Sequence, residues 1–262
     1  MTSATTDAPH QTFGVGSLIS ESLSIFFSNI IKISMIAFVP AAVGLIISGM
    51  LIGFGAALGT ADPQFGSAAG TGAFAISTLI NMIIYGITIA VLVMFAYDAK
   101  MNRVGGVGGY FAPALRHAVP ILILVLVITI IATIGFMLLV LPGLWIYAVF
   151  CATIPAVVIE SAGFGAMGRS SRLTKGYRWP IIGAMILFGI IIIVLSMVAA
   201  FGGAMIGGIF GGGFGLAVNL IVTALVSAFS YGLSAIFIAL VYARLREMKE
   251  GVSVSDLAKV FE

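Results

Sequence analysis

The sequence predicts an all-α fold, a six-span transmembrane helical bundle with amphipathic interfacial helices. Of the 262 residues, 61% are hydrophobic and only 8% are charged, whereas a soluble domain carries roughly 25% charged residues. So few charges cannot cover the water-exposed surface of a chain of this length, so lipid must be the solvent for most of it. The apolar residues also fall into six separate long stretches, each a candidate membrane span.

Three regions are expected along the chain. Residues 1–12 are mostly small and polar, so we predict a disordered N-terminal tail there. Residues 13–247 hold the six-helix membrane domain, and residues 248–262 form a cytoplasmic C-terminal tail. No polar stretch is long enough to form a separate soluble domain.

The first half of the chain contains two interfacial stretches and three spans. Residues 14–31 are amphipathic at helical spacing, which predicts a helix lying in the membrane interface. The first span, at 34–58, contains Pro40, which we expect to kink the helix. A loop at 59–72 leads to the second span, and a basic loop with a second interfacial helix at 106–118 leads to the third. These two spans are predicted at 73–97 and 119–141.

The second half begins with a turn predicted at the Leu-Pro-Gly sequence of 141–143. The fourth span, 144–159, is short for a bilayer that requires about 20 apolar residues, and Pro155 interrupts it. Between the last two spans, the glycine-rich stretch 202–215 is either a flexible loop or a tightly packed helix end followed by a turn. Its Met, Ile and Phe residues favour the second interpretation. The last two spans are predicted at 180–203 and 216–242.

Charge placement predicts the topology. Six spans put both ends of the chain on one side, and all twelve Lys and Arg residues then lie on that side. The opposite side carries Asp62 in the loop 59–72 and no basic residue. The positive-inside rule therefore predicts that both termini are cytoplasmic.

The segment 160–179 contains the candidate site. Ser161 would cap a helix covering about 163–175, and Gly176 would end it. Such a helix would lie at the level of the lipid headgroups and present cations to anionic lipid or to a protein partner. The basic residues of this contact surface are Arg169, Arg172, Lys175 and Arg178. The same charges would also be explained by topology and solubility alone.

Glu160 is the one acid at the cytoplasmic end of an apolar span. A carboxylate at membrane depth is costly and normally pairs with a cation. We predict a structural ion pair with Arg169, Arg172 or Arg116, which would tie the fourth span to the basic helix. A proton or substrate site is the alternative interpretation of Glu160.

The sequence does not indicate an enzyme. It contains no HExxH, GxSxG or Walker pattern, and its single cysteine, Cys151, lies inside an apolar span. Its two histidines, His10 and His117, are far apart in the sequence. We therefore expect no catalytic residue, no cofactor and no metal site. The net charge of +3 comes from basic loops and does not indicate a nucleic-acid partner.

An internal repeat is also visible. An amphipathic stretch precedes each odd-numbered span, at 14–31, 106–118 and 163–178, and a helical hairpin follows each. Three such units would be able to pack around a pseudo-threefold axis, because parallel repeats occur in membrane proteins.

The stretch 141–180 resembles the signature of a broad group of bacterial multispan membrane proteins. In that group a Pro-Gly corner leads through a span to a Glu, and then to an Arg-Ser-x-x-Leu-x-x-Gly-x-x-Trp run. The chain's exit from its last span, Tyr-x-x-Leu-Arg-x-x-Lys-Glu-Gly at 242–251, is also similar to that group's. The group includes the membrane domain of glycerophosphoryl diester phosphodiesterases and the YciC-like inner-membrane proteins. The matching positions of the central run are Pro142, Gly143, Glu160, Arg169, Ser170, Leu173, Gly176 and Trp179.

The resemblance implies a multi-pass protein of the bacterial cytoplasmic (inner) membrane. It does not imply diester hydrolysis, because no acid-and-His metal site of those enzymes can be carried over to a position here. Our first functional expectation is a non-enzymatic accessory or scaffold protein whose basic cytoplasmic face contacts membrane lipids, a protein partner or a second copy. The alternative is a small-molecule or lipid transporter, with a path lined by Asn81, Asn219 and the glycines.

Overall fold

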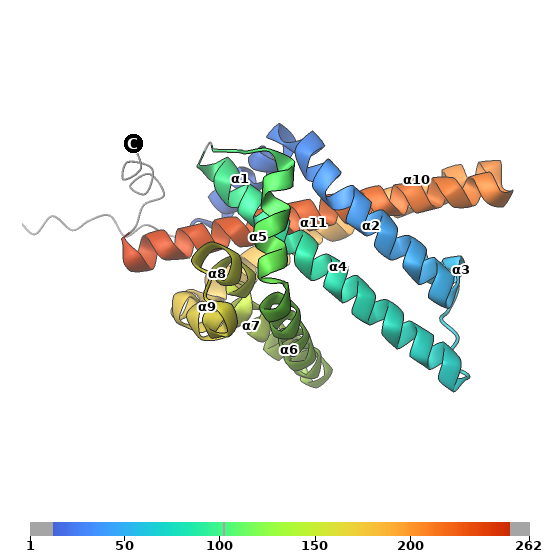
Figure 1. Ribbon diagram of the computed structural model, residues 1–262. Coiled ribbons are helices and arrows are strands. Elements are labelled where there is room, and N and C mark those ends of the chain that lie inside the picture. Colours follow the sequence, from blue (N-terminus) through green and yellow to red (C-terminus); the bar gives the residue numbers. More distant parts are fainter. Residues whose placement is uncertain (1–12, 102, 252–262) are drawn as a thin grey trace, which may run out of the picture.

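The computed structural model describes residues 13–101 and 103–251, and in these residues all of the regular secondary structure is helical (Figure 1). The all-α fold predicted from the sequence is therefore confirmed. Six helical segments are long and apolar enough to cross a membrane, as predicted. They are α2 (Ile30–Ile52), α4 (Ala68–Lys100), α6 (Ala118–Leu138), α7 with α8 (Val140–Phe150 and Thr153–Glu160), α10 (Arg178–Phe210) and α11 (Gly212–Glu250).

Short helical segments stand between the long ones. Each of the three hairpins α2–α4, α6–α7 and α10–α11 is preceded by such a segment, as the sequence repeat predicts. The tails 1–12 and 252–262 lie outside the described residues, and α11 extends to Glu250, beyond the predicted domain end at 247. The short segments are α1 (Val15–Ser28), α3 (Phe54–Ala57), η1 (Val107–Tyr110), α5 (Phe111–Arg116), η2 (Gly163–Gly165) and α9 (Ala166–Thr174).

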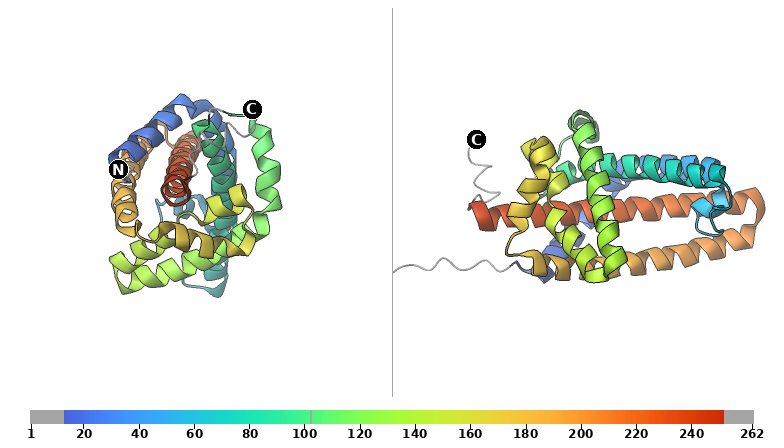
Figure 2. Two further views of the ribbon diagram at one scale, coloured as in Figure 1. Left: turned by 90° about the vertical axis from the view of Figure 1, so that its left-hand side faces the viewer. Right: turned by 90° about the horizontal axis from the view of Figure 1, so that it is seen from below.

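Helix α11 occupies the centre of the molecule. In the end-on view of Figure 2 (left), the other helices surround it, and it packs against α1, α2, α4 and α10 as well as α8 and α9. Its C-terminal half contributes fully buried side chains, including Ile236, Leu240 and Tyr242. Because one helix of the third unit fills the centre, the three units do not pack equivalently around a threefold axis.

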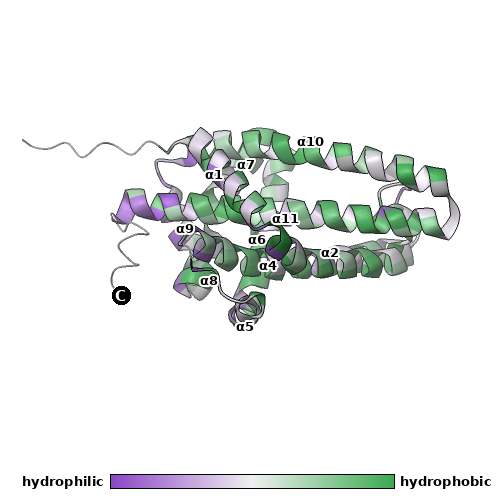
Figure 3. Cartoon of the chain, turned by 90° about the horizontal axis from the view of Figure 1, so that it is seen from above, coloured by the Kyte–Doolittle hydropathy of each residue, from purple (hydrophilic) through white to green (hydrophobic). Residues whose placement is uncertain are grey.

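The long helices have two orientations. Helices α2, α4, α10 and α11 extend toward the same end of the molecule, with α2 and α4 inclined to α10 and α11 (Figure 1), whereas the α6–α7 hairpin lies across them (Figure 2, right). Figure 3 shows that hydrophilic residues gather at the end of the molecule where α11 terminates. Glycines allow α6 and α7 to pack closely in their hairpin, since a Cβ atom on Gly135 would lie only 3.1 Å from the Cα atom of Gly143.

The turn between the third and fourth spans differs from the prediction. It lies at Leu139, which is extended (φ −163°, ψ 156°), and α7 already begins at Val140. Pro142 and Gly143 therefore lie in the first turn of α7. Proline has no N–H group, but the N–H groups of a first turn have no partner within the helix, so Pro142 costs no helical hydrogen bond. The fourth apolar segment is consequently 21 residues long and is not short.

Prolines and glycines elsewhere follow simple backbone rules. The fourth segment breaks at 151–152 because Pro155 has no N–H group to donate to the carbonyl of Cys151. By contrast, α2 is one helix from Ile30 to Ile52 with Pro40 inside it. In the glycine-rich stretch, α10 and α11 continue to a single turn residue, Gly211 (φ +59°), so the helix-end interpretation is confirmed.

The closed end of the α6–α7 hairpin gives a first prediction. A methyl group on Gly143 would overlap the ring of Phe136, so we expect Gly143→Ala to lower the free energy of unfolding by about 1–3 kcal/mol. Gly189→Ala in α10 is the matched control, because beyond its own stretch of helix backbone nothing lies within 4 Å of its new Cβ atom. Thermal unfolding in detergent, followed by tryptophan fluorescence, measures both variants. Equal melting temperatures would contradict the close packing.

Candidate functional site

Glu160, at the end of α8, is the centre of a charged cluster. Arg169 of α9 donates two hydrogen bonds to its carboxylate, from Nε to Oε2 at 2.7 Å and from Nη2 to Oε1 at 2.8 Å. The hydroxyl of Tyr242 donates to Oε1, and Nε of Arg246 lies 3.6 Å from the same oxygen. Glu250 completes the set, which we name the Glu160 cluster: Glu160, Arg169, Tyr242, Arg246 and Glu250.

Helical spacing places three members of the Glu160 cluster on one face of α11. Tyr242, Arg246 and Glu250 are four residues apart, so their side chains are neighbours. Glu250 pairs with both Arg246, at 3.1 Å, and Arg169. Two carboxylates thereby face two guanidinium groups, and α8, α9 and α11 are joined by the same charges.

The charges of the Glu160 cluster are well shielded from water. The side chains of Glu160 and Arg169 are 20% and 23% exposed, so their attraction is screened less than that of a surface pair. The hydrogen bonds to Glu160 raise the pKa of the Arg169 guanidinium above its ordinary value, so Arg169 stays charged. A bidentate pair of this kind fixes orientation as well as distance.

Ser161 does not cap the following helix, contrary to the prediction. It has a left-handed backbone conformation (φ 54°, ψ 33°) and ends α8. This conformation turns the chain sharply, so that η2 and α9 return Arg169 to Glu160, nine residues earlier. Gly176 (φ +92°) follows the last turn of α9, at the helix end that the sequence predicts.

Hydroxyl groups fix the other face of α9 against the break between α7 and α8. The Ser170 hydroxyl donates to the carbonyl of Val149 at 2.7 Å and accepts from the N–H group of Ala152 at 3.2 Å. The Thr174 hydroxyl donates to the same Val149 carbonyl at 3.2 Å. A helix break in an apolar setting leaves backbone groups unpaired, and these two buried side chains satisfy them.

A carboxylate also connects each of two further short segments, α1 and η1, to the long helices. Glu21 of α1 lies 3.3 Å from Lys100 of α4 and 3.6 Å from Arg244 of α11. Asp98 of α4 accepts a 3.0 Å hydrogen bond from the hydroxyl of Tyr110 in η1. Carboxylates therefore anchor a short segment before each of the three hairpins, α1, η1 and α9, at the end of the molecule where α4 and α11 terminate.

The four basic residues of the predicted contact surface have different environments. Arg169 is paired within the Glu160 cluster, whereas Arg172 and Lys175 are exposed and pair with no acid among the described residues. The Arg178 guanidinium is half-buried and stacks over the ring of Trp145, 5.5 Å from its centroid. Of the three partners offered for Glu160, only Arg169 is in contact, and Arg246 is an additional partner that the sequence did not indicate.

An apolar groove, here named the tryptophan groove, lies between α7 and the start of α10. It has a volume of about 380 Å³, and the rings of Trp145 and Trp179 meet in it with centroids 5.3 Å apart. Nε of Arg178, beside the Trp145 ring, is buried and has no hydrogen-bond partner among the described residues. The groove is lined by Leu141, Pro142, Trp145, Ile146, Trp179 and Ile182.

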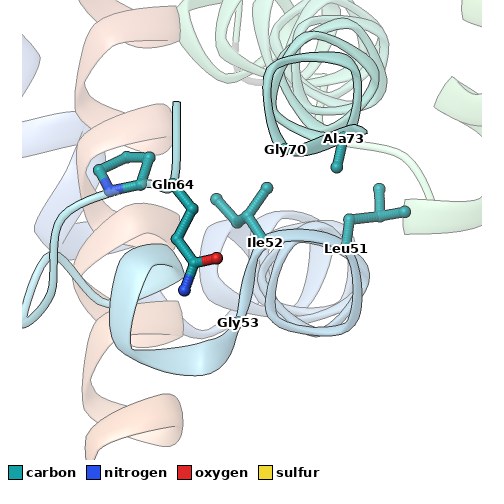
Figure 4. Close-up of a pocket in the computed structure, with 7 residues that line it drawn as sticks. Leu51, Ile52, Gly53, Gln64, Gly70 and Ala73 are labelled. Atoms are coloured by element: carbon teal, nitrogen blue, oxygen red, sulfur yellow. The ribbon is translucent and has the colours of Figure 1, made fainter. Parts of the chain in front are cut away.

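Two further cavities lie at the opposite end of the long helices. One, of about 290 Å³, is formed where α2 meets the loop before α4, and Figure 4 shows the Gln64 amide among its apolar neighbours. The other, of about 310 Å³, is lined in part by Asn219, which donates to the carbonyl of Gly215. Asn81, the second asparagine of the transport alternative, donates to Ser48 within the α2–α4 hairpin. The two asparagines therefore bond within separate hairpins.

Comparisons with known proteins found no similar chain. It matches no protein-family model, no curated protein and no solved structure. Within the described residues, no group of three or more His, Cys, Asp and Glu side chains is placed to hold a metal ion. The chemistry of the site must therefore be argued from the Glu160 cluster and the tryptophan groove themselves.

The Glu160 cluster gives a second prediction. Glu160→Gln removes a charge that faces two guanidinium groups, so we expect the free energy of unfolding to fall by about 2–4 kcal/mol. Glu247→Gln is the control, since Glu247 lies on the same helix and forms no ion pair with a described residue; a change within about 0.5 kcal/mol is expected. Chemical unfolding in detergent, followed by circular dichroism, measures both.

A double-mutant cycle makes this test specific to the ion pair. If Glu160 and Arg169 interact, the double variant Glu160→Gln with Arg169→Gln will lose less free energy of unfolding than the two single variants together. We expect a difference of at least about 1 kcal/mol. Strictly additive losses would show that the pair does not contribute as a unit.

Proposed function

We propose that this chain is a non-enzymatic accessory or scaffold protein of the bacterial cytoplasmic membrane, which binds anionic phospholipid at its cytoplasmic face. The proposal includes both termini on the cytoplasmic side and membership of the multispan group that the sequence resembles. The clustering of Arg172 near the end of α9 with Lys175 and Arg178 beyond it supports a contact with phosphate groups, because Arg169 alone of the four basic residues is neutralised by acids.

Arg178 at the tryptophan groove is the observation that carries the proposal. Its Nε group is buried without a hydrogen-bond partner among the described residues, and such a donor costs free energy until an acceptor reaches it. The Arg178 side chain as a whole is half-buried, so an outward turn of it would let a lipid phosphate supply that acceptor. An acyl chain would fill the apolar groove beside Trp145 and Trp179. Lys175 is exposed nearby in sequence and would add a second positive charge.

This binding mode makes a direct prediction about lipid preference. The chain has two tryptophans, and both line the groove. Brominated phosphatidylglycerol should therefore quench their fluorescence at a lower mole fraction than brominated phosphatidylcholine. Arg178→Gln should reduce this preference about fivefold, since one cation near the headgroups contributes about 1 kcal/mol.

Arg116→Gln is the matched control for the lipid test. Arg116 is an exposed cation on α5 that, unlike Arg178, does not lie over the ring of Trp145, and its loss should leave the preference unchanged. Equal quenching of the wild type by both lipids would overturn the proposal. An equal loss in the Arg116 and Arg178 variants would point to general attraction by the basic face and not to a site. Capture of a protein partner with no lipid preference would support the partner interpretation instead.

A further inference from the structure

The turn of the α6–α7 hairpin is apolar throughout. Residues 136–141 read Phe-Met-Leu-Leu-Val-Leu, and all six are exposed, from 40% for Phe136 to 82% for Met137. An apolar patch of this kind is not stable in water, so a turn that emerged from the membrane would normally be polar. The turn between α3 and α4 fits that rule, because it contains Thr60, Asp62 and Gln64.

The position of this turn relative to α10 is the second observation. If α6 and α7 crossed the membrane, their turn would lie at the far end of α10. Trp145, only five residues after Val140, would then be more than about 20 Å from Trp179, because the hydrocarbon core is about 30 Å thick. The rings of Trp145 and Trp179 are in fact 5.3 Å apart, at the first turn of α10.

Further contacts place the hairpin at the same level. Leu141, in the first turn of α7, lines the tryptophan groove together with Ile182 from the start of α10. By contrast, the α2–α4 hairpin reaches the far end of α10, since Leu58 and Thr60 line a cavity with Phe201. Figure 2 agrees with these contacts, because the α6–α7 hairpin lies across the direction of the four longer helices.

The geometry points to the α6–α7 hairpin as an intramembrane wedge, which enters the cytoplasmic leaflet and returns to the same face without crossing. Its partner is the acyl-chain layer of that leaflet, and the other four long helices cross the bilayer. Lipid is the neighbour that the hairpin requires, because α6 is the most apolar of the six segments, with a mean hydropathy of 3.1. Only 28% of its apolar stretch is buried within the protein.

The chain's own features are consistent with this placement. A hairpin that returns to its starting face leaves every basic residue on the side that charge placement predicts, so the topology argument is unaffected. Pro142 removes one of the N–H groups that the first turn of α7 would leave unpaired, which is favourable in hydrocarbon. The wedge does not depend on the proposed binding of anionic phospholipid, because it concerns acyl chains and not headgroups.

Spin-label accessibility tests the wedge in reconstituted phosphatidylethanolamine–phosphatidylglycerol vesicles. On a Cys151→Ala background, labels are placed at Leu139→Cys in the turn, Ile193→Cys in the middle of α10 and Gln64→Cys in the polar turn. We expect the label at 139 to behave like that at 193, relaxed strongly by oxygen and weakly by a water-soluble nickel chelate. The label at 64 should show the reverse.

Each other outcome overturns the proposal. Nickel access at 139 equal to that at 64 would place the turn in water. Protection from both reagents would mean that protein, such as a second copy, covers it. Cross-linking in native membranes shows which leaflet holds the end of the hairpin. A short thiol reagent should join Leu141→Cys to Ile182→Cys but not to Met205→Cys near the far end of α10. A cross-link to Met205→Cys alone would show that the hairpin crosses.

Discussion

The need of the Glu160 carboxylate for cationic partners organises the end of the molecule where α4 and α11 terminate. An unpaired carboxylate at that depth would be costly, and Glu160 is supplied with Arg169 from one helix and Arg246 from another. Satisfying this one group therefore fixes three helices at once. Glu21 and Asp98 act in the same way for α1 and η1, so the short segments are positioned by charge and the long helices by apolar contact.

This division of roles explains which cations remain for a ligand. Arg169 lies in the most basic segment, yet Glu160 and Glu250 neutralise it. Its neighbours Arg172 and Lys175 remain exposed, and Arg178 is turned toward the tryptophan groove. In the proposed function the ion pair of Glu160 with Arg169 holds α9 in place, and the cations Arg172, Lys175 and Arg178 bind phosphate. In the proposed wedge, the α6–α7 hairpin supplies the apolar wall of the same groove.

The sequence predicted much of this structure because hydropathy and charge are local signals. It predicted the six apolar segments, the three short segments before hairpins and the participation of Glu160 in the site. It placed the turn at 141–143 because proline and glycine usually mark turns, although Pro142 is equally suited to a first helical turn. It missed Tyr242 and Arg246 because their approach to Glu160, 82 and 86 residues away in the chain, depends on tertiary packing. Hydropathy also does not indicate how an apolar helix is oriented relative to the other helices, so the sequence did not predict that the α6–α7 hairpin lies across them.

The account depends most on the claim that Glu160 holds α9 against α11. Amide hydrogen exchange of the reconstituted protein tests this claim directly, because local opening exposes the amides of the helix that detaches. In Glu160→Gln we predict faster exchange in 166–174, with the exchange of 68–80, at the opposite end of α4, unchanged. Unchanged protection of 166–174, or an equal increase in both segments, would contradict the account.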